Sequence, residues 1–236
     1  MDRGGVVKGS DCAVGITHFA RRRPGPEATI EDAVALQIPY LFQSRRLPLW
    51  TARSASIGAG RPDLVAVSYE PRVLALAELQ ELKPDILAYL RGIRCARLET
   101  IADRLDSPRQ QMARRLERLA ELDVVGRQDE TFWLLPRWRY ILPDVVSIEV
   151  KVSDWGKAVQ QAARNRIFAH RSFVAVPEWV AQRVRREPVF RELGIGLLAV
   201  SNGDEVTVVR RARREKPIVW TYYYRLASLA AIHSQE

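Results

Sequence analysis

Residues 147–152 restrict the fold of this chain more than any other stretch. Their sequence, Ser-Ile-Glu-Val-Lys-Val, alternates polar and apolar side chains, which is typical of a β-strand that buries one face. Because successive side chains of a strand point to opposite faces, Glu149 and Lys151 would lie side by side on the polar face. The stretch predicts a protein built on a sheet, and an ordinary surface ion pair is the simplest interpretation of the two charges.

A second stretch gives these charges a functional interpretation. Residues 58–67 read Gly-Ala-Gly-Arg-Pro-Asp-Leu-Val-Ala-Val, so a glycine-rich turn leads into an apolar strand with Asp63 at its start. Pro-Asp before one strand and Glu-x-Lys in a later strand resemble the metal-dependent PD-(D/E)XK nuclease superfamily. Both motifs are short, and their strand context carries the resemblance, which covers about residues 30–70 and 144–215.

The resemblance implies an α/β fold in which a restriction-endonuclease-like mixed β-sheet is flanked by helices. It also implies that Asp63 and Glu149 come together from neighbouring strands to hold a metal ion, with the carbonyl of Val150 as a further ligand. Lys151 would orient the attacking water or stabilise the transition state. Oxygen ligands suit Mg²⁺ or Mn²⁺. The two cysteines and three histidines are too scattered to predict a zinc site or a Cys/His nucleophile.

A helix is predicted before the first of these strands, at residues 27–43, because apolar residues recur there at helical spacing. In the superfamily such a helix often adds a glutamate to the metal site. Glu31 is the better match as a catalytic residue, and Glu27, one turn earlier on the same face, is the alternative. Both glutamates would equally stabilise a helix N-terminus through their charge alone.

A second helix is predicted at residues 155–170, after Ser153 and Asp154, which are residue types that cap helices. In the superfamily the helix after Glu-x-Lys often supplies a Gln or Lys that contacts the scissile phosphate or the DNA backbone. The resemblance therefore implies a catalytic role for Gln161 and a DNA-binding role for Lys157. A plain solvated helix face is the alternative interpretation.

A long insertion separates the two motifs and is able to form a domain of its own. Three short helices and a β-ribbon are predicted over residues 80–138, and together they resemble a winged helix-turn-helix. We therefore expect a discontinuous nuclease-like core at residues 1–70 and 144–236, with an inserted winged-helix (α+β) domain at residues 71–143.

In this second resemblance, residues 108–121 are the recognition helix, which would enter the major groove of DNA. Its apolar stripe would pack inward, and its Arg and Gln side chains suit base edges and phosphates. The candidates for DNA binding are Arg109, Gln110, Arg114, Arg115 and Arg118. The alternative is a solvated face on a module that binds protein, and the excess of positive charge favours DNA.

The amino-acid composition agrees with a polyanion as the partner. The chain has 37 basic and 28 acidic residues in a length of 236, which gives a formal net charge of +9. We find no uninterrupted apolar run long enough to cross a bilayer and no signal-peptide pattern, so we expect a cytoplasmic protein without a membrane partner.

The leading hypothesis is a Mg²⁺-dependent endonuclease that hydrolyses phosphodiester bonds in duplex or branched DNA, in restriction, repair or defence. Cutting both strands would suit a homodimer. One alternative is a DNA-binding or regulatory protein whose nuclease fold is catalytically silent. Another is a structural partner whose winged helix contacts other proteins.

Overall fold

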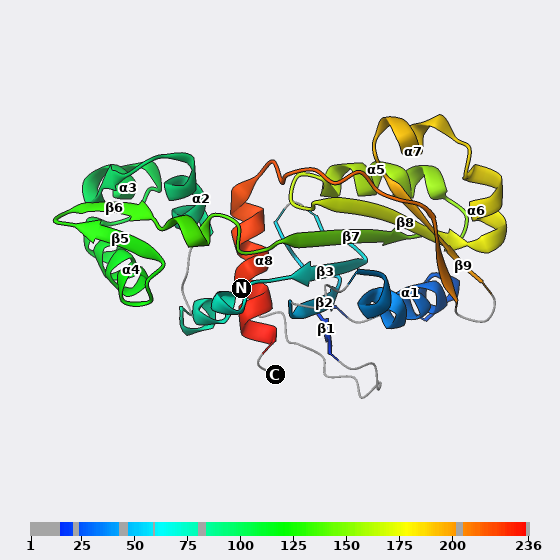
Figure 1. Cartoon of the computed structure of the whole chain (residues 1–236), viewed down its shortest axis with the longest axis horizontal. Coiled ribbons are helices and arrows are strands. Elements are labelled where there is room, and N and C mark those ends of the chain that lie inside the picture. Colours follow the sequence, from blue (N-terminus) through cyan, green and yellow to red (C-terminus); the bar gives the residue numbers. More distant parts are fainter. Residues whose placement is uncertain are drawn as a thin grey trace. The chain divides into compact units, whose positions relative to one another are not determined.

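The computed structural model describes residues 15–20, 24–42, 47–58, 60–79, 84–201 and 205–234, which fall into two compact units (Figure 1). The first, called here the sheet unit, belongs to Met1–Tyr69 and Asp144–Val219. The second, called here the insert unit, belongs to Glu70–Pro143 and Trp220–Glu236. No helix in the described ranges is long and apolar enough to cross a membrane.

A seven-stranded mixed sheet is the centre of the sheet unit, with the strand order β1-β2-β3-β7-β8-β9-β10. Strands β7, β8 and β9 run parallel to one another, whereas the β2-β3, β3-β7 and β9-β10 pairs are antiparallel and β1 is parallel to β2. The strand bounds are Ile16–His18, Leu49–Arg53, Leu64–Ser68, Asp144–Val150, Arg171–Pro177, Gly196–Val200 and Val206–Arg210.

Helices cover both faces of this sheet, so the predicted mixed α/β architecture with flanking helices is confirmed. Helix α1 (Pro26–Phe42) packs on one face, and α5 (Trp155–Asn165) and α6 (Glu178–Val184) pack on the other (Figure 1). A short helix, α7 (Pro188–Glu192), follows α6, because Pro188 begins a new helix within the basic segment. Helix α5 ends at Asn165, five residues earlier than the sequence pattern predicts.

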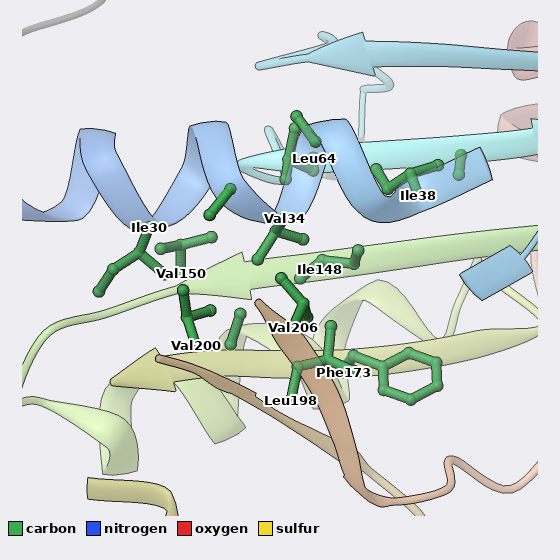
Figure 2. Packing of buried hydrophobic residues seen from close by; sticks show 14 of the residues in the cluster. Ile30, Val34, Ile38, Leu64, Ile148, Val150, Phe173, Leu198, Val200 and Val206 are labelled. Atoms are coloured by element: carbon green, nitrogen blue, oxygen red, sulfur yellow. The ribbon is translucent and has the colours of Figure 1, made fainter. Parts of the chain in front are cut away.

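The alternation along β7 decides which side chains each face receives. Ile148 and Val150 belong to the apolar cluster under α1, together with Ile30 and Val34 of that helix (Figure 2). Glu149 points the other way, toward α5, where Asn165 donates a hydrogen bond to it. The predicted strand therefore has the predicted two faces, but its polar face is covered by a helix and is buried.

Direct pairing of β3 with β7 brings the two sequence motifs together. Leu64 is opposite Ile148 in this antiparallel pair, so Asp63, one residue earlier, comes to the level of Glu149. The long insertion thus leaves the sheet between two strands that are neighbours in it. The expectation that the two carboxylates come from neighbouring strands is confirmed.

The insert unit combines helices with a small antiparallel sheet of order β4-β6-β5. Its apolar stripe on α4 is buried as the sequence predicts, through Met112, Leu116 and Leu119. The elements are η1 (Pro71–Glu78), α2 (Pro84–Gly92), β4 (Ala96–Arg97), α3 (Leu98–Arg104), α4 (Arg109–Glu121), β5 (Val125–Gln128), β6 (Thr131–Leu134), η2 (Pro136–Trp138) and α8 (Trp220–His233).

The assignment of residues 144–236 to one domain is wrong at its C-terminal end. Helix α8 belongs to the insert unit, where it packs on η1 and α2. Its buried tyrosines explain this: the backbone N–H of Leu142 donates to the Tyr223 hydroxyl at 2.7 Å, and the Tyr224 hydroxyl donates to the carbonyl of Trp138 at 3.0 Å. The helical pattern of α8 predicts a buried face but does not tell which unit buries it.

Candidate active site

Asp63 is fixed at the end of β7 by a backbone hydrogen bond. The N–H of Val150 donates to Oδ2 of Asp63 at 2.8 Å, a bond that strand pairing alone would not make, because Asp63 precedes the first residue of β3. The carboxyl groups of Asp63 and Glu149 interact directly, and the charge of Asp63 raises the pKa of Glu149. The Pro-Asp and Glu-x-Lys motifs therefore meet at one point of the sheet.

Lys151 adds a positive charge at the same place. Its ammonium Nζ lies 3.8 Å from Oδ2 of Asp63 and 3.2 Å from Oε2 of Glu27, and it donates to the carbonyl of Val150 at 2.7 Å. Lys151 follows the last residue of β7, which lets its side chain reach the first turn of α1. Asp63, Glu149, Lys151 and Glu27 form what is called here the carboxylate cluster.

The side chain of Glu149 is the most strongly perturbed member of this cluster. The residue is 2% exposed, and only Oε1 has a hydrogen-bond donor among the described residues, the amide Nδ2 of Asn165 at 2.6 Å. The other oxygen, Oε2, is buried and has no hydrogen-bond partner among the residues that the structure describes. Burial first, and the charge of Asp63 second, raise the pKa of Glu149 to about 8.

Asp63 shows the same effect in a weaker form. Burial raises the pKa of Asp63 above its ordinary value, against the opposing effects of the Val150 N–H and the Lys151 ammonium. Two adjacent carboxylates, one buried and one half-buried, repel each other when both are ionised. At neutral pH the pair therefore retains a proton unless a cation offsets its charge.

The oxygens of Asp63 and Glu149 form a donor set that would suit a hard divalent cation. Mg²⁺ prefers carboxylate oxygens and keeps several water ligands, so two protein carboxylates are sufficient. The predicted third ligand, the carbonyl of Val150, is engaged by the ammonium of Lys151. In the described part of the chain, no group of three or more His, Cys, Asp or Glu residues is assembled as a metal cluster.

Helix α1 directs Glu27, rather than the better sequence match Glu31, to Lys151. Glu31 faces β2, where its Oε1 lies 3.6 Å from Nε of Arg53, and Asp32 lies 2.7 Å from Nη1 of the same guanidinium. The Arg53 side chain is 7% exposed and needs nearby negative charge. A role for Glu31 in the site stays a prediction, whereas its alternative, Glu27, contacts the cluster directly.

Helix α5 contributes one residue that sequence reasoning did not single out. Asn165, which is buried, holds Glu149, and it lies one helical turn after Gln161. The sequence signal for Asn165 was its four-residue spacing from Gln161 and Lys157, which places all three residues on one face of a helix. Oε1 of Gln161 is buried without a hydrogen-bond partner in the described structure, while the Lys157 side chain is exposed.

The predicted DNA-binding residues lie together on α4 of the insert unit, but some have acidic partners. Nη2 of Arg109 lies 2.7 Å from Oε1 of Glu130 and 3.4 Å from that of Glu99, and Nη1 of Arg118 lies 2.8 Å from Oε2 of Glu121. These are surface pairs, in which the side chains of both partners are about half exposed or more. Such pairs contribute little to stability, so a phosphate can compete for these guanidinium groups.

The other three candidates on α4 differ in exposure. Gln110 and Arg114 are exposed, and Arg115 is half-buried. Arg114 is exposed, as Arg109 and Arg118 are, and is accessible to a ligand. The structure places all five candidates on one helix.

Comparisons of the chain with protein-family models, with curated proteins and with solved structures gave no match. We therefore infer function from the geometry of the carboxylate cluster.

Proposed function

We propose that this chain is a metal-dependent deoxyribonuclease of the PD-(D/E)XK type, in which the sheet unit is the restriction-endonuclease-like core. The observation that carries the proposal is the position of Asp63, which accepts the Val150 N–H beside Glu149, an acid with a buried oxygen that has no hydrogen-bond partner among the described residues. A nuclease of this type needs two adjacent carboxylates and a lysine at one point of a sheet.

Asp63 and Glu149 would hold Mg²⁺ or Mn²⁺. When bound, such an ion supplies an activated water and neutralises charge on the phosphate. The Val150 N–H orients Asp63 and the Asn165 amide orients Glu149, so both carboxylates are positioned before substrate arrives. This preorganisation is what the two hydrogen bonds contribute.

Lys151 is the residue of the cluster that would act on substrate. The side chain of Lys151 is 16% exposed, and its ammonium contacts Glu27, Asp63 and the Val150 carbonyl. A phosphate oxygen would compete with these acceptors for its three donors. Glu27 would then serve as the counter-charge that keeps Lys151 near the carboxylates before the phosphate binds.

The insert unit supports the DNA-binding part of the proposal. Its helices α2, α3 and α4 and its three-stranded sheet resemble a winged helix-turn-helix, with α4 in the position of the recognition helix. We propose that α4 contacts DNA through Gln110 and Arg114 and through the arginines that exchange their surface glutamates for phosphates.

A catalytically silent nuclease fold that only binds DNA is the second candidate. One observation favours it: Lys151 donates to the Val150 carbonyl, the oxygen that the superfamily resemblance assigns to the metal. In a silent protein this contact would be permanent. In an active one, substrate and metal would displace it.

Cleavage of a substrate panel tests the proposal. Supercoiled plasmid, linear duplex, single-stranded and branched DNA would each be incubated with Mg²⁺, Mn²⁺ or EDTA. We expect metal-dependent cleavage by the wild type and a loss of at least about a hundredfold in Asp63→Asn and Glu149→Gln. The matched control is Glu192→Gln on α7, an exposed residue outside the cluster, which should cleave like the wild type. DNA that is bound but uncut under every condition would contradict the proposal.

A further inference from the structure

A pocket of about 510 Å³ opens at the carboxyl ends of the parallel strands β7, β8 and β9 in the sheet unit. Its lining includes Thr29 and Ile30 of α1, Val152 after β7, Trp179 of α6, and Val200 and Ser201 at the end of β9. Ligands of open α/β sheets commonly bind outside the carboxyl ends of the strands. The volume is within the range of small-molecule sites.

The wall of this pocket adjoins members of the carboxylate cluster along the chain. Val152, in its wall, follows Lys151 directly, and Ile30 lies one helical turn after Glu27. Figure 2 shows Ile30 and Val200, two pocket residues, gathered around Val150 at the same end of the core. A ligand in the pocket would therefore lie at the end of β7 on the α1 face, close to the contact between Lys151 and Glu27.

The chemistry of the pocket wall fits a flat aromatic ligand. Trp179 is 59% exposed, and the guanidinium of Arg183 lies 5.6 Å from its ring centroid. Arg183 can cover only one face of the ring, and the exposure of the side chain leaves ring surface available for stacking. The hydroxyl groups of Thr29 and Ser201 add hydrogen-bonding capacity, and none of the described lining residues is acidic.

We propose that this pocket binds an unpaired nucleobase of the substrate, stacked on Trp179, while the phosphate beside that base reaches Lys151 and the two carboxylates. The proposal rests on the proposed nuclease function and names its substrate class: DNA with an unpaired nucleotide at the cut, as in single strands, flaps and splayed junctions. A base inside a duplex is stacked on its neighbours and enters such a pocket only after unstacking. Base stacking on aromatic side chains is tolerant of sequence, so no base preference is expected.

Binding without metal tests the pocket separately from cleavage. Fluorescence anisotropy would compare a labelled single strand with a labelled duplex hairpin, both in EDTA, for the wild type, Trp179→Ala and Trp179→Phe. We expect Trp179→Ala to weaken single-strand binding by about tenfold or more and duplex binding by less than about twofold. Trp179→Phe keeps an aromatic platform and should retain most of the affinity. The matched control is Tyr40→Ala, which removes an aromatic residue of α1 that is 84% exposed and away from the pocket lining.

Two results would overturn the pocket proposal: equal weakening of both DNA forms by Trp179→Ala, or no weakening of either. Thermal melts of each variant exclude a folding defect as the cause. Parallel cleavage assays separate the two proposals. If the wild type cuts nothing but single-strand binding depends on Trp179, the nuclease function fails and the pocket stands. If cleavage requires Glu149 but is indifferent to Trp179 on every substrate, the pocket fails and the nuclease function stands.

Discussion

The two units of this chain use the same kinds of charged side chains in opposite ways. In the sheet unit, Asp63 and Lys151 have side chains that are 31% and 16% exposed, and Glu149 beside them is almost completely buried. In the insert unit, Arg118 and Glu121 form a tighter pair, but their side chains are 49% and 62% exposed. Because water screens the second pair more than the first, a shorter distance between charged atoms does not by itself mean a stronger interaction.

The difference teaches where to look for function in this chain. Exposed pairs such as Arg118 with Glu121 are common products of a helix surface and need no special explanation. A buried acid whose pKa is raised to about 8, as for Glu149, is costly to the fold and persists at sites where it is used. The raised pKa of Glu149 means that keeping this buried acid ionised lowers the stability of the fold.

The largest expected effect is on activity, and it compares a buried lysine with an exposed one. Lys151→Met should reduce DNA cleavage by about a hundredfold or more, because it removes the positive charge beside the reacting phosphate. Lys216→Met, at an exposed position of the same unit, should reduce it by less than about threefold. Single-turnover cleavage rates at saturating Mg²⁺ measure both variants. Equal losses in the two would show that only overall charge matters.

The next effect is on stability and its pH dependence. The pKa of Glu149 is higher in the folded protein, about 8, than its ordinary value of 4.5, so the folded state binds the proton more tightly than the unfolded state. In EDTA, the contribution of Glu149 to the free energy of unfolding should thus be most favourable below about pH 4.5. It should fall as the pH rises from about 4.5 through 8.

Glu149→Gln should remove that dependence and raise the free energy of unfolding by up to about 4 kcal/mol at pH 8 without metal. Urea unfolding at pH 5 and at pH 8 measures the effect, with Glu192→Gln as the control that keeps the wild-type slope. Added Mg²⁺ should stabilise the wild type at pH 8 and leave Glu149→Gln unchanged. A variant less stable than the wild type at pH 8 in EDTA would refute the electrostatic account.

A smaller effect concerns the attachment of α8 to the insert unit. Tyr224→Phe removes the hydroxyl that donates to the buried carbonyl of Trp138 and should reduce the stability of the insert unit by about 1 to 2 kcal/mol. Hydrogen exchange of the insert unit should accelerate while that of β7 and β8 stays unchanged. Faster exchange in both units alike would mean that they unfold as one.

The smallest effects are expected on the surface of α4. Glu121→Ala should change the free energy of unfolding by less than about 0.5 kcal/mol. Arg114→Ala should weaken DNA binding a few-fold and reduce the slope of log affinity against log salt concentration by about 1. Arg72→Ala, an exposed arginine outside α4, is the control. An unchanged slope for Arg114→Ala would favour the protein-binding interpretation of the insert unit.

The sequence was sufficient for the parts of the site that depend on local pattern. The alternation at residues 147–152 predicts a strand with Val150 and Glu149 on opposite faces, and the structure has this arrangement. The pairing of Asp63 with this strand came from a family resemblance, and the register of β3 with β7 agrees with it. The spacing of apolar residues and the residue types at turns predict where strands begin and end to within a few residues.

The contacts between side chains from distant parts of the chain could not be predicted from local pattern. Glu27 and Glu31 share a helix face, and the choice between them depends on Arg53, a buried cation of β2 that contacts Glu31. The role of Asn165 was not predicted because a polar residue on a polar helix face is expected to contact solvent. In the structure, α5 directs Asn165 toward Glu149 instead. Helical periodicity reveals that a face is buried or polar but not what lies against it.

The most direct test of the central claim is calorimetric titration of the wild type and Glu149→Gln with Mn²⁺ or Mg²⁺ at pH 7, in two buffers of different ionisation enthalpy. Because the pKa of Glu149 is raised to about 8, this acid is mostly protonated at pH 7 and must lose its proton to bind a cation. The account predicts one metal ion per wild-type chain with release of about one proton, and no binding to Glu149→Gln. Equal binding by both proteins, or no binding by either, would contradict it.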